Sequence, residues 1–240
     1  MPVTQPTMEE VAKLFEAELH LGHKRNRLHP KARKYVYRIE NGTSIIDLTQ
    51  TAIQLSAAKT FLKKAKEENK TILAVATKKV ANAYMADLCK KEGIPYITAK
   101  WLPGLLTNFQ TIIKNVKKLN EMRTARDQNG WDNLTKHERV QLAKEVTKLE
   151  KFYAGISTLT KKPDILFILD IRKEHNAVKE AKQTDIKIVA VTDTNTNPET
   201  VDYPIVANDD SPKAIEYLLT DIISAYTNAE VKIAEVKPAQ

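Results

Sequence analysis

Short apolar runs alternate along the chain with longer segments in which apolar residues recur every three or four positions. The runs predict buried strands at residues 72–76, 96–98, 165–169, 188–191 and 205–206. The periodic segments predict helices at residues 9–19, 49–68, 81–92, 174–184 and from 213 onward, the last capped by Ser211-Pro212. Strands that alternate with helices predict an α/β fold, with a parallel sheet covered by helices on both faces.

Two further strand-like pieces lie near the N-terminus, at residues 35–39 and 44–46, and they flank Asn41-Gly42. An Asn-Gly pair between two such pieces is typical of a tight turn. We therefore expect these two pieces to be joined by a turn at Asn41-Gly42.

The stretch from residue 107 to 155 interrupts the alternation, because it has no strand signal. Apolar residues step by three and four in two series, which are Phe109, Ile112, Val116, Leu119 and Met122, then Leu142, Val146, Leu149, Phe152 and Ile156. Such narrow apolar seams predict an antiparallel coiled-coil hairpin, with two ordinary surface helices as the alternative. The expected organisation is an α/β/α globular domain (1–106 and 156–228), the hairpin insertion (107–155) and a disordered tail (229–240).

The composition narrows the class of protein. The chain has 240 residues, a net charge of +8 and a sequence pI near 9.3, and this surplus alone is a weak sign of a polyanionic partner. No targeting pattern and no membrane-spanning apolar run is present, so we expect a cytoplasmic protein without a membrane partner. The single cysteine, Cys89, excludes an internal disulfide, and its periodic position in a predicted helix favours burial.

Positive charge concentrates between Leu19 and Ile39, where the chain has seven Lys or Arg residues and no acid. These residues are Lys24, Arg25, Arg27, Lys31, Arg33, Lys34 and Arg38. Such clusters bind phosphates because each neutralised phosphate releases counterions, and the nearby Tyr35 and Tyr37 could stack on unpaired bases. A solvated charged loop is the alternative, but such loops usually balance the two signs of charge.

Histidines in the same segment raise the question of a metal ion. His20 and His23 lie three residues apart, with His29 close by, and this spacing could place two imidazoles on one helical face. The adjacent Gly22 and the cationic neighbours oppose a divalent cation. We therefore expect no metal site, and prefer contacts to RNA or hydrogen bonds that lock turns.

Little in the sequence favours an enzyme. None of the six glycines forms a nucleotide-binding loop, and no serine stands in a nucleophile elbow. Carboxylates do follow predicted strands, at Asp170, Asp193 and Asp209-Asp210, where a doubly wound sheet has its ligand crevice. They could serve as acid, base or magnesium ligands, but hydrogen bonds to their own backbone, as turns and helix caps, are the favoured role.

A stiff turn is predicted at the start of the hairpin, at residues 101–104 with Pro103 and Gly104. Thr107 can cap the helix that follows. Lys100 and Trp101 would offer a cation and a stacking face to RNA, whereas a core tryptophan in a tight loop is the alternative.

In their order, these motifs resemble the family of bacterial small-subunit ribosomal protein two. The matching pieces are His20-Leu21-Gly22-His23, Pro30-Lys31, Asn41-Gly42, Ile45-Ile46-Asp47-Leu48, Thr77-Lys78-Lys79, Trp101-Leu102 with Gly104, Leu106-Thr107-Asn108-Phe109, Asp193-Thr194-Asn195 with Pro198, and Asp202-Tyr203-Pro204-Ile205 with Asn208-Asp209-Asp210. Each motif alone is weak evidence for the family. Together they occur in the family's order and cover nearly the whole chain. The chain departs from the family's usual residues at Glu18, Leu28, His29, Lys100, Pro103, Leu105 and Ala207, with glycine usual in place of Glu18.

The resemblance implies a flavodoxin-like α/β/α domain and a structural, non-catalytic role in the small ribosomal subunit, without cofactors. It implies that the chain clamps small-subunit ribosomal RNA where head and body meet, and docks neighbouring ribosomal proteins, among them the messenger-binding protein number one. The residues expected to contact RNA are Lys24, Arg25, Arg27, Lys31, Arg33, Lys34, Lys78, Lys79, Lys100, Trp101, Thr107 and Asn108. Two alternatives remain: a doubly wound enzyme acting on a phosphorylated small molecule through Asp170 and Asp193, and an interaction module that uses only the hairpin.

Overall fold

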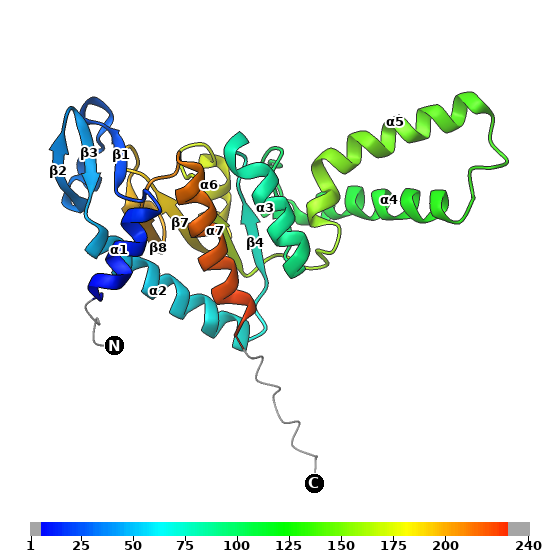
Figure 1. Ribbon diagram of the computed structural model, residues 1–240. Helices are drawn as coiled ribbons and strands as arrows, with labels where there is room; N and C mark the ends of the chain where they lie inside the picture. The colour runs from blue at the N-terminus through cyan, green and yellow to red at the C-terminus, as the bar shows by residue number, and fades with distance from the viewer. Residues whose placement is uncertain (1–5, 230–240) are drawn as a thin grey trace, which may run out of the picture. The chain divides into compact units, whose positions relative to one another are not determined.

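The structure is a computed structural model, and it describes residues 6–229. Five strands form one sheet in the order β5-β4-β6-β7-β8. Their bounds are β4 Ile72–Val75, β5 Tyr96–Ile97, β6 Ile165–Ile168, β7 Lys187–Thr192 and β8 Tyr203–Val206. Helices flank this sheet, whose registered pairs β4–β5, β4–β6 and β6–β7 are parallel. The strand order is that of flavodoxin-like folds, so the expected three-layer α/β/α class is confirmed (Figure 1).

The apolar runs become central strands because every side chain in them is buried. All four residues of β4 and all four of β6 are buried, and Ile72 pairs with Ile165 at the start of the two strands. A strand covered on both faces needs apolar residues at consecutive positions, which explains the absence of alternation in these runs. The expected strands are thereby confirmed, with ends shifted by up to two residues.

The expected helices are also present. Their bounds are α1 Met8–Glu16, α2 Leu48–Glu67, α3 Lys79–Glu92, α4 Phe109–Asp127, α5 Lys136–Tyr153, α6 His175–Gln183 and α7 Pro212–Thr227, with short 3₁₀ turns η1 Arg25–Arg27, η2 Pro30–Tyr35, η3 Ala154–Ile156 and η4 Pro198–Thr200. None of the helices within residues 6–229 combines the length and the apolar character that crossing a bilayer requires.

One expected helix cap is confirmed in position only, and one is wrong. Ser211 is the N-cap residue of α7 and Pro212 opens the helix, but the Ser211 side chain makes no capping bond, and its hydroxyl donates to the Glu18 carboxylate at 2.6 Å. Thr107 does not cap α4, since the residue that precedes this helix is Asn108, whose side chain makes no capping bond. In both places the sequence offers a capping side chain, but it bonds elsewhere.

The chain divides into two compact units, of which the first contains residues up to 71 and from 191. In this unit α2 packs against α1, α7 and β8. A small antiparallel sheet has the order β1-β3-β2, with β1 at Leu21–Lys24, β2 at Val36–Glu40 and β3 at Thr43–Ile46. Asn41 and Gly42 have φ values of 47° and 77°, which is the positive-φ pair of a tight hairpin turn. The turn is therefore confirmed, whereas β1 was not expected.

The second unit contains residues 72–190, including α4 and α5. These two helices (green in Figure 1) pack against each other and extend away from β4 and α3. Their contact includes two ion pairs between the helices, Lys118–Glu145 at 2.5 Å and Arg123–Glu150 at 2.9 Å. The coiled-coil geometry and the domain boundaries remain predictions. The expected disordered tail lies, from residue 230 onward, outside the described residues.

Candidate nucleic-acid interface

The segment from β1 to β2 is held against the loop that follows β7. His23 N donates to Thr194 Oγ1 at 2.9 Å, and His29 N donates to the Thr194 carbonyl at 2.8 Å. A Cβ on Gly22 would lie 2.7 Å from Thr194 Cγ2, so only glycine allows β1 to approach this closely. These contacts fix the backbone from which the basic side chains project.

His23 lies between two carboxylates. Its Nδ1 is 2.7 Å from Asp193 Oδ2, its Nε2 is 3.6 Å from Asp210 Oδ2, and the Asn195 amide is 2.9 Å from Nε2. The hydrogen bond to Asp193 raises the pKa of His23, with a smaller contribution from the charge of Asp210. Because the amide nitrogen of Asn195 can only donate, Nε2 accepts in this geometry and the imidazole donates to Asp193 from Nδ1.

His23, Asp193 and Asp210 are the only group of side chains within residues 6–229 that could hold a metal ion. One possible donor atom of each lies within 4.8 Å of the others. His20, the other histidine candidate, is not part of it. The His20 ring stacks on Phe15 with centroids 4.2 Å apart, and burial lowers the pKa of His20. The structure therefore does not bring the two histidines to one site.

The basic segment is partly neutralised by carboxylates from elsewhere in the chain. Glu199 accepts from Lys31 at 2.9 Å and from Lys34 at 3.1 Å, and these bonds lower the pKa of Glu199. Arg38 pairs with Glu40 at 2.9 Å. The other four of the seven cations are exposed and have no ion pair within the described residues. They are Lys24, Arg25, Arg27 and Arg33. Four of the seven cations thus remain available to a ligand.

A surface hollow marks the same place. It has a volume of about 430 Å³ and is lined by Lys24, Arg25, Asn26 and Gly42. Arg25 N donates to the Gly42 carbonyl at 2.8 Å, which joins the turn between β2 and β3 to the start of η1. The two unpaired cations therefore border a concave surface that a phosphate could enter.

The remaining predicted contacts belong to the second unit. Lys78 is mostly buried and lies 3.3 Å from Asp170, whereas Lys79 is exposed. Lys100 is exposed and has no ion pair within the described part of the chain. Lys79 and Lys100 therefore present their charge to solvent, whereas the charge of Lys78 is shared with Asp170.

One carboxylate organises the loop before α4. Glu180 on α6 accepts from the indole N–H of Trp101 at 3.0 Å, and from the backbone N–H groups of Gly104 at 2.8 Å and Leu106 at 3.1 Å. Trp101 is only 4% exposed, so its ring belongs to the core, as the alternative interpretation held. Thr107 and Asn108 follow the loop and are exposed.

Several side chains bond to one another beyond the ends of β4 and β6, where the strand order reverses. Lys173 donates to the Thr77 carbonyl at 2.6 Å, and the Thr77 hydroxyl donates to Glu174. Glu174 is buried, and this burial raises the pKa of its carboxyl. Together with the pair of Lys78 and Asp170, these contacts occupy the position where a doubly wound enzyme binds its ligand.

Two of the carboxylates that follow the strands, Asp170 and Asp193, take the favoured structural role. Asp170 Oδ1 accepts from the backbone N–H groups of Arg172 at 2.8 Å and Lys173 at 3.2 Å. Asp193 Oδ1 accepts from the Thr194 backbone at 2.5 Å. Both therefore stabilise turns, as expected.

Sequence reasoning missed the two buried or half-buried glutamates, Glu174 and Glu180, and the acid that pairs with the basic segment, Glu199. No local signal could have identified them, because each lies in an ordinary charged segment. Their partners are distant in the chain, by 97, 79 and 165 residues.

The fold and this surface define the class of the protein as a three-layer α/β/α protein with a cluster of exposed cations in the segment from β1 to β2. Residues 14–229 match the family model described as ribosomal protein S2. The chain belongs to the ribosomal protein S2 family.

Curated bacterial relatives support this membership. The protein named small ribosomal subunit protein uS2 from Coprothermobacter proteolyticus is 41% identical over 212 residues, which cover 88% of this chain and 79% of that protein. Its namesake from Flavobacterium johnsoniae is 40% identical over 238 residues, covering 96% and 94%. The expectations of a structural role in the small ribosomal subunit, without catalysis, and of a location in the ribosome, are thereby confirmed.

Proposed function

We propose that the chain binds small-subunit ribosomal RNA through the unpaired cations of the segment from β1 to β2. The observation that carries this proposal is a set of four exposed cations that have no carboxylate partner among residues 6–229, which are Lys24, Arg25, Arg27 and Arg33. A polyanion that contacts them need not displace an internal ion pair. Each phosphate so neutralised contributes about 0.9 to the slope of log K against log salt for a duplex, and about 0.7 for a single strand.

The other residues predicted to contact RNA differ in how directly they could do so. Lys79 and Lys100 are exposed and can meet phosphates directly. Lys31 and Lys34 each share Glu199, so an approaching phosphate would compete with that carboxylate. Trp101 acts by fixing the loop before α4 rather than by stacking on a base.

The test is the salt dependence of binding to small-subunit ribosomal RNA. The variant Lys24→Ala, Arg25→Ala, Arg27→Ala should bind more weakly, with a slope reduced by about 2 to 3, because up to three phosphate contacts are lost. A charge-matched control replaces by alanine three exposed lysines that make no ion pair with any described residue, Lys63, Lys90 and Lys91. Equal slopes for the two variants would contradict the proposal.

We infer further that residues 107–155 form a separate projecting hairpin that helps dock a neighbouring ribosomal protein. The support is a pair of long helices with few buried side chains, of which α5 has only Val146 buried. Deleting residues 109–152 and restoring the chain with a short linker should abolish partner binding and leave the RNA affinity of the basic segment intact. Retained partner binding would contradict this role.

A further inference from the structure

Tyr37 on β2 differs from the other tyrosines of the chain in its exposure. All eight tyrosines lie within residues 6–229, and Tyr37, at 72%, is the only one of them that is exposed. Its hydroxyl makes no hydrogen bond with any described residue. Tyr35, the other tyrosine of the basic segment, is partly buried, and the Lys34 ammonium lies over its ring, 5.2 Å from the centroid. Of these two rings, that of Tyr37 therefore offers the larger free surface.

The backbone of β2 explains why this ring is left in solvent. In the small sheet β1-β3-β2, β2 is an edge strand with only β3 beside it. Val36 pairs with Ile46 and Arg38 pairs with the adjacent Ile45, so the register shifts and Tyr37 has no paired residue on β3. An extra residue of this kind interrupts the regular alternation of faces and re-aims its side chain. The ring of Tyr37 is therefore not packed on the sheet.

The charge around this ring suits RNA. The Arg38 guanidinium lies over the ring, with its central carbon 6.0 Å from the centroid, and pairs with Glu40 at 2.9 Å. Lys24, which has no ion pair within the described residues, ends β1 in the same sheet, and Arg25 is hydrogen-bonded to the turn between β2 and β3. An exposed aromatic ring beside cations is the combination with which proteins bind single-stranded nucleic acids.

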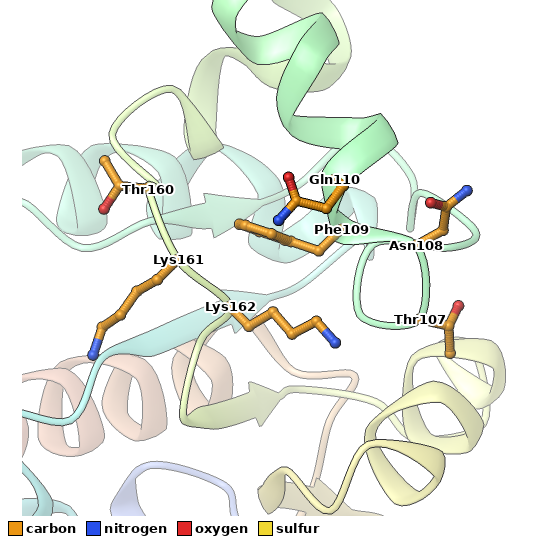
Figure 2. A pocket seen from close by; sticks show the side chains of 7 residues that line it. All are labelled: Thr107, Asn108, Phe109, Gln110, Thr160, Lys161 and Lys162. Carbon is orange, nitrogen blue, oxygen red and sulfur yellow. The ribbon is translucent and has the colours of Figure 1, made fainter.

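The hollow at the start of α4, in the second unit, lacks this combination (Figure 2). Lys161 and Lys162 line it together with Phe109. Phe109 is only 6% exposed, so its ring presents no free face to a base. Cations alone therefore do not make this hollow a base-binding site.

We propose that Tyr37 stacks on an unpaired base of small-subunit ribosomal RNA whose backbone phosphates are held by Lys24 and Arg25. This inference rests on the function proposed above and adds the class of RNA element to it. A base inside a duplex is covered by its neighbours on both faces, whereas an unpaired base can be splayed out and stacked on an aromatic side chain. The surface therefore binds a single-stranded element, such as a loop or a bulge.

The first arm of the test measures the affinity of the full chain for small-subunit ribosomal RNA over a range of salt concentrations. Tyr37→Ala should weaken binding about fivefold to a hundredfold at every salt concentration, which is the usual effect of losing one base stack. The slope of log K against log salt should not change, because no phosphate contact is lost. Tyr37→Phe keeps the ring and should bind like the parent chain. The control is Phe15→Ala, which removes a 58% exposed ring from α1 and should leave the affinity unchanged.

Four results of this arm would overturn the proposal. They are an unchanged affinity in Tyr37→Ala, a reduced salt slope in that variant, an equal loss in Tyr37→Phe, and an equal loss in Phe15→Ala. Because Tyr37 is exposed, its variants should keep the urea midpoint of the parent chain, so that a loss of affinity reports binding rather than folding.

The second arm compares single-stranded oligoadenylate with an RNA duplex. Tyr37→Ala should weaken binding of the single strand and spare the duplex, and equal losses on both would contradict the stacking of an unpaired base. The phosphate contacts are tested by the variant of Lys24, Arg25 and Arg27 through its salt slope, whereas Tyr37 should change only the affinity at a given salt concentration. The two proposals can therefore fail independently.

Discussion

Removing the Glu180 carboxylate should loosen the loop from which α4 departs. This side chain accepts four hydrogen bonds, from Trp101 and Gly104 through Oε1, and from Leu106 and Thr107 through Oε2. The two changes that separate these contributions are Glu180→Gln, which keeps one acceptor oxygen, and Glu180→Ala, which removes both.

The expected magnitudes follow from the donors left without a partner. A hydrogen bond to a charged group contributes about 1.5–3 kcal/mol, and a buried unsatisfied donor costs about 1–3 kcal/mol. In Glu180→Gln an amide NH₂ faces the Leu106 donor, so we expect a loss of about 2 kcal/mol. In Glu180→Ala the indole N–H of the buried Trp101 is also left unsatisfied, so we expect about 4 kcal/mol. This is a large share of a typical total stability of about 5–15 kcal/mol.

The assay is urea unfolding followed by circular dichroism, together with hydrogen exchange of the Gly104 and Leu106 amides. Exchange at these two amides should accelerate in both variants before global unfolding. The control is Glu121→Ala, which removes an exposed glutamate of α4 that makes no ion pair or hydrogen bond within the described residues. If Glu180→Ala were as stable as this control, the organising role of the carboxylate would be refuted.

Glu18 has a φ of 62°, so Glu18→Gly should lower the urea midpoint less than Glu18→Ala, and a larger loss for glycine would contradict this. Burial raises the pKa of Cys89 to about 12, so a disulfide reagent at pH 8 should label the native chain slower than the unfolded chain by a factor on the order of 10³ or more. The hydrogen bond to Asp193 raises the pKa of His23 from 6.5, so its contribution to stability should be full below pH 6.5 and decline as pH rises through the folded value. Unfolding free energies that show the same pH profile for His23→Gln and for the parent chain would refute this.

The hydrophobic pattern predicted most of the α/β order because buried strands and amphipathic helices have distinct periods. It missed β1, because Leu21–Lys24 contains one large apolar residue, a glycine and two polar residues. This strand forms through pairing with β3 and through the close approach of Gly22 to Thr194. Both contacts depend on the tertiary fold and leave no local signal.

The sequence likewise predicted part of the candidate site and missed another part. The concentration of charge between Leu19 and Ile39 was visible in the sequence, and four of its seven cations have no ion pair within the part of the chain that the structure describes. The neutralisation of Lys31 and Lys34 by Glu199 was not visible, since the partners are more than 160 residues apart in the chain. An acid-free stretch of sequence is therefore not the same as an acid-free surface.

The most direct test of the central claim is a cryo-electron microscopy structure of the small ribosomal subunit that contains this chain. The account predicts that charged groups of Lys24, Arg25, Arg27 and Arg33 lie within about 4 Å of RNA phosphate oxygens, the distance of an ion pair. If these side chains instead faced bulk solvent while RNA approached another surface, the proposed mode of binding would be contradicted.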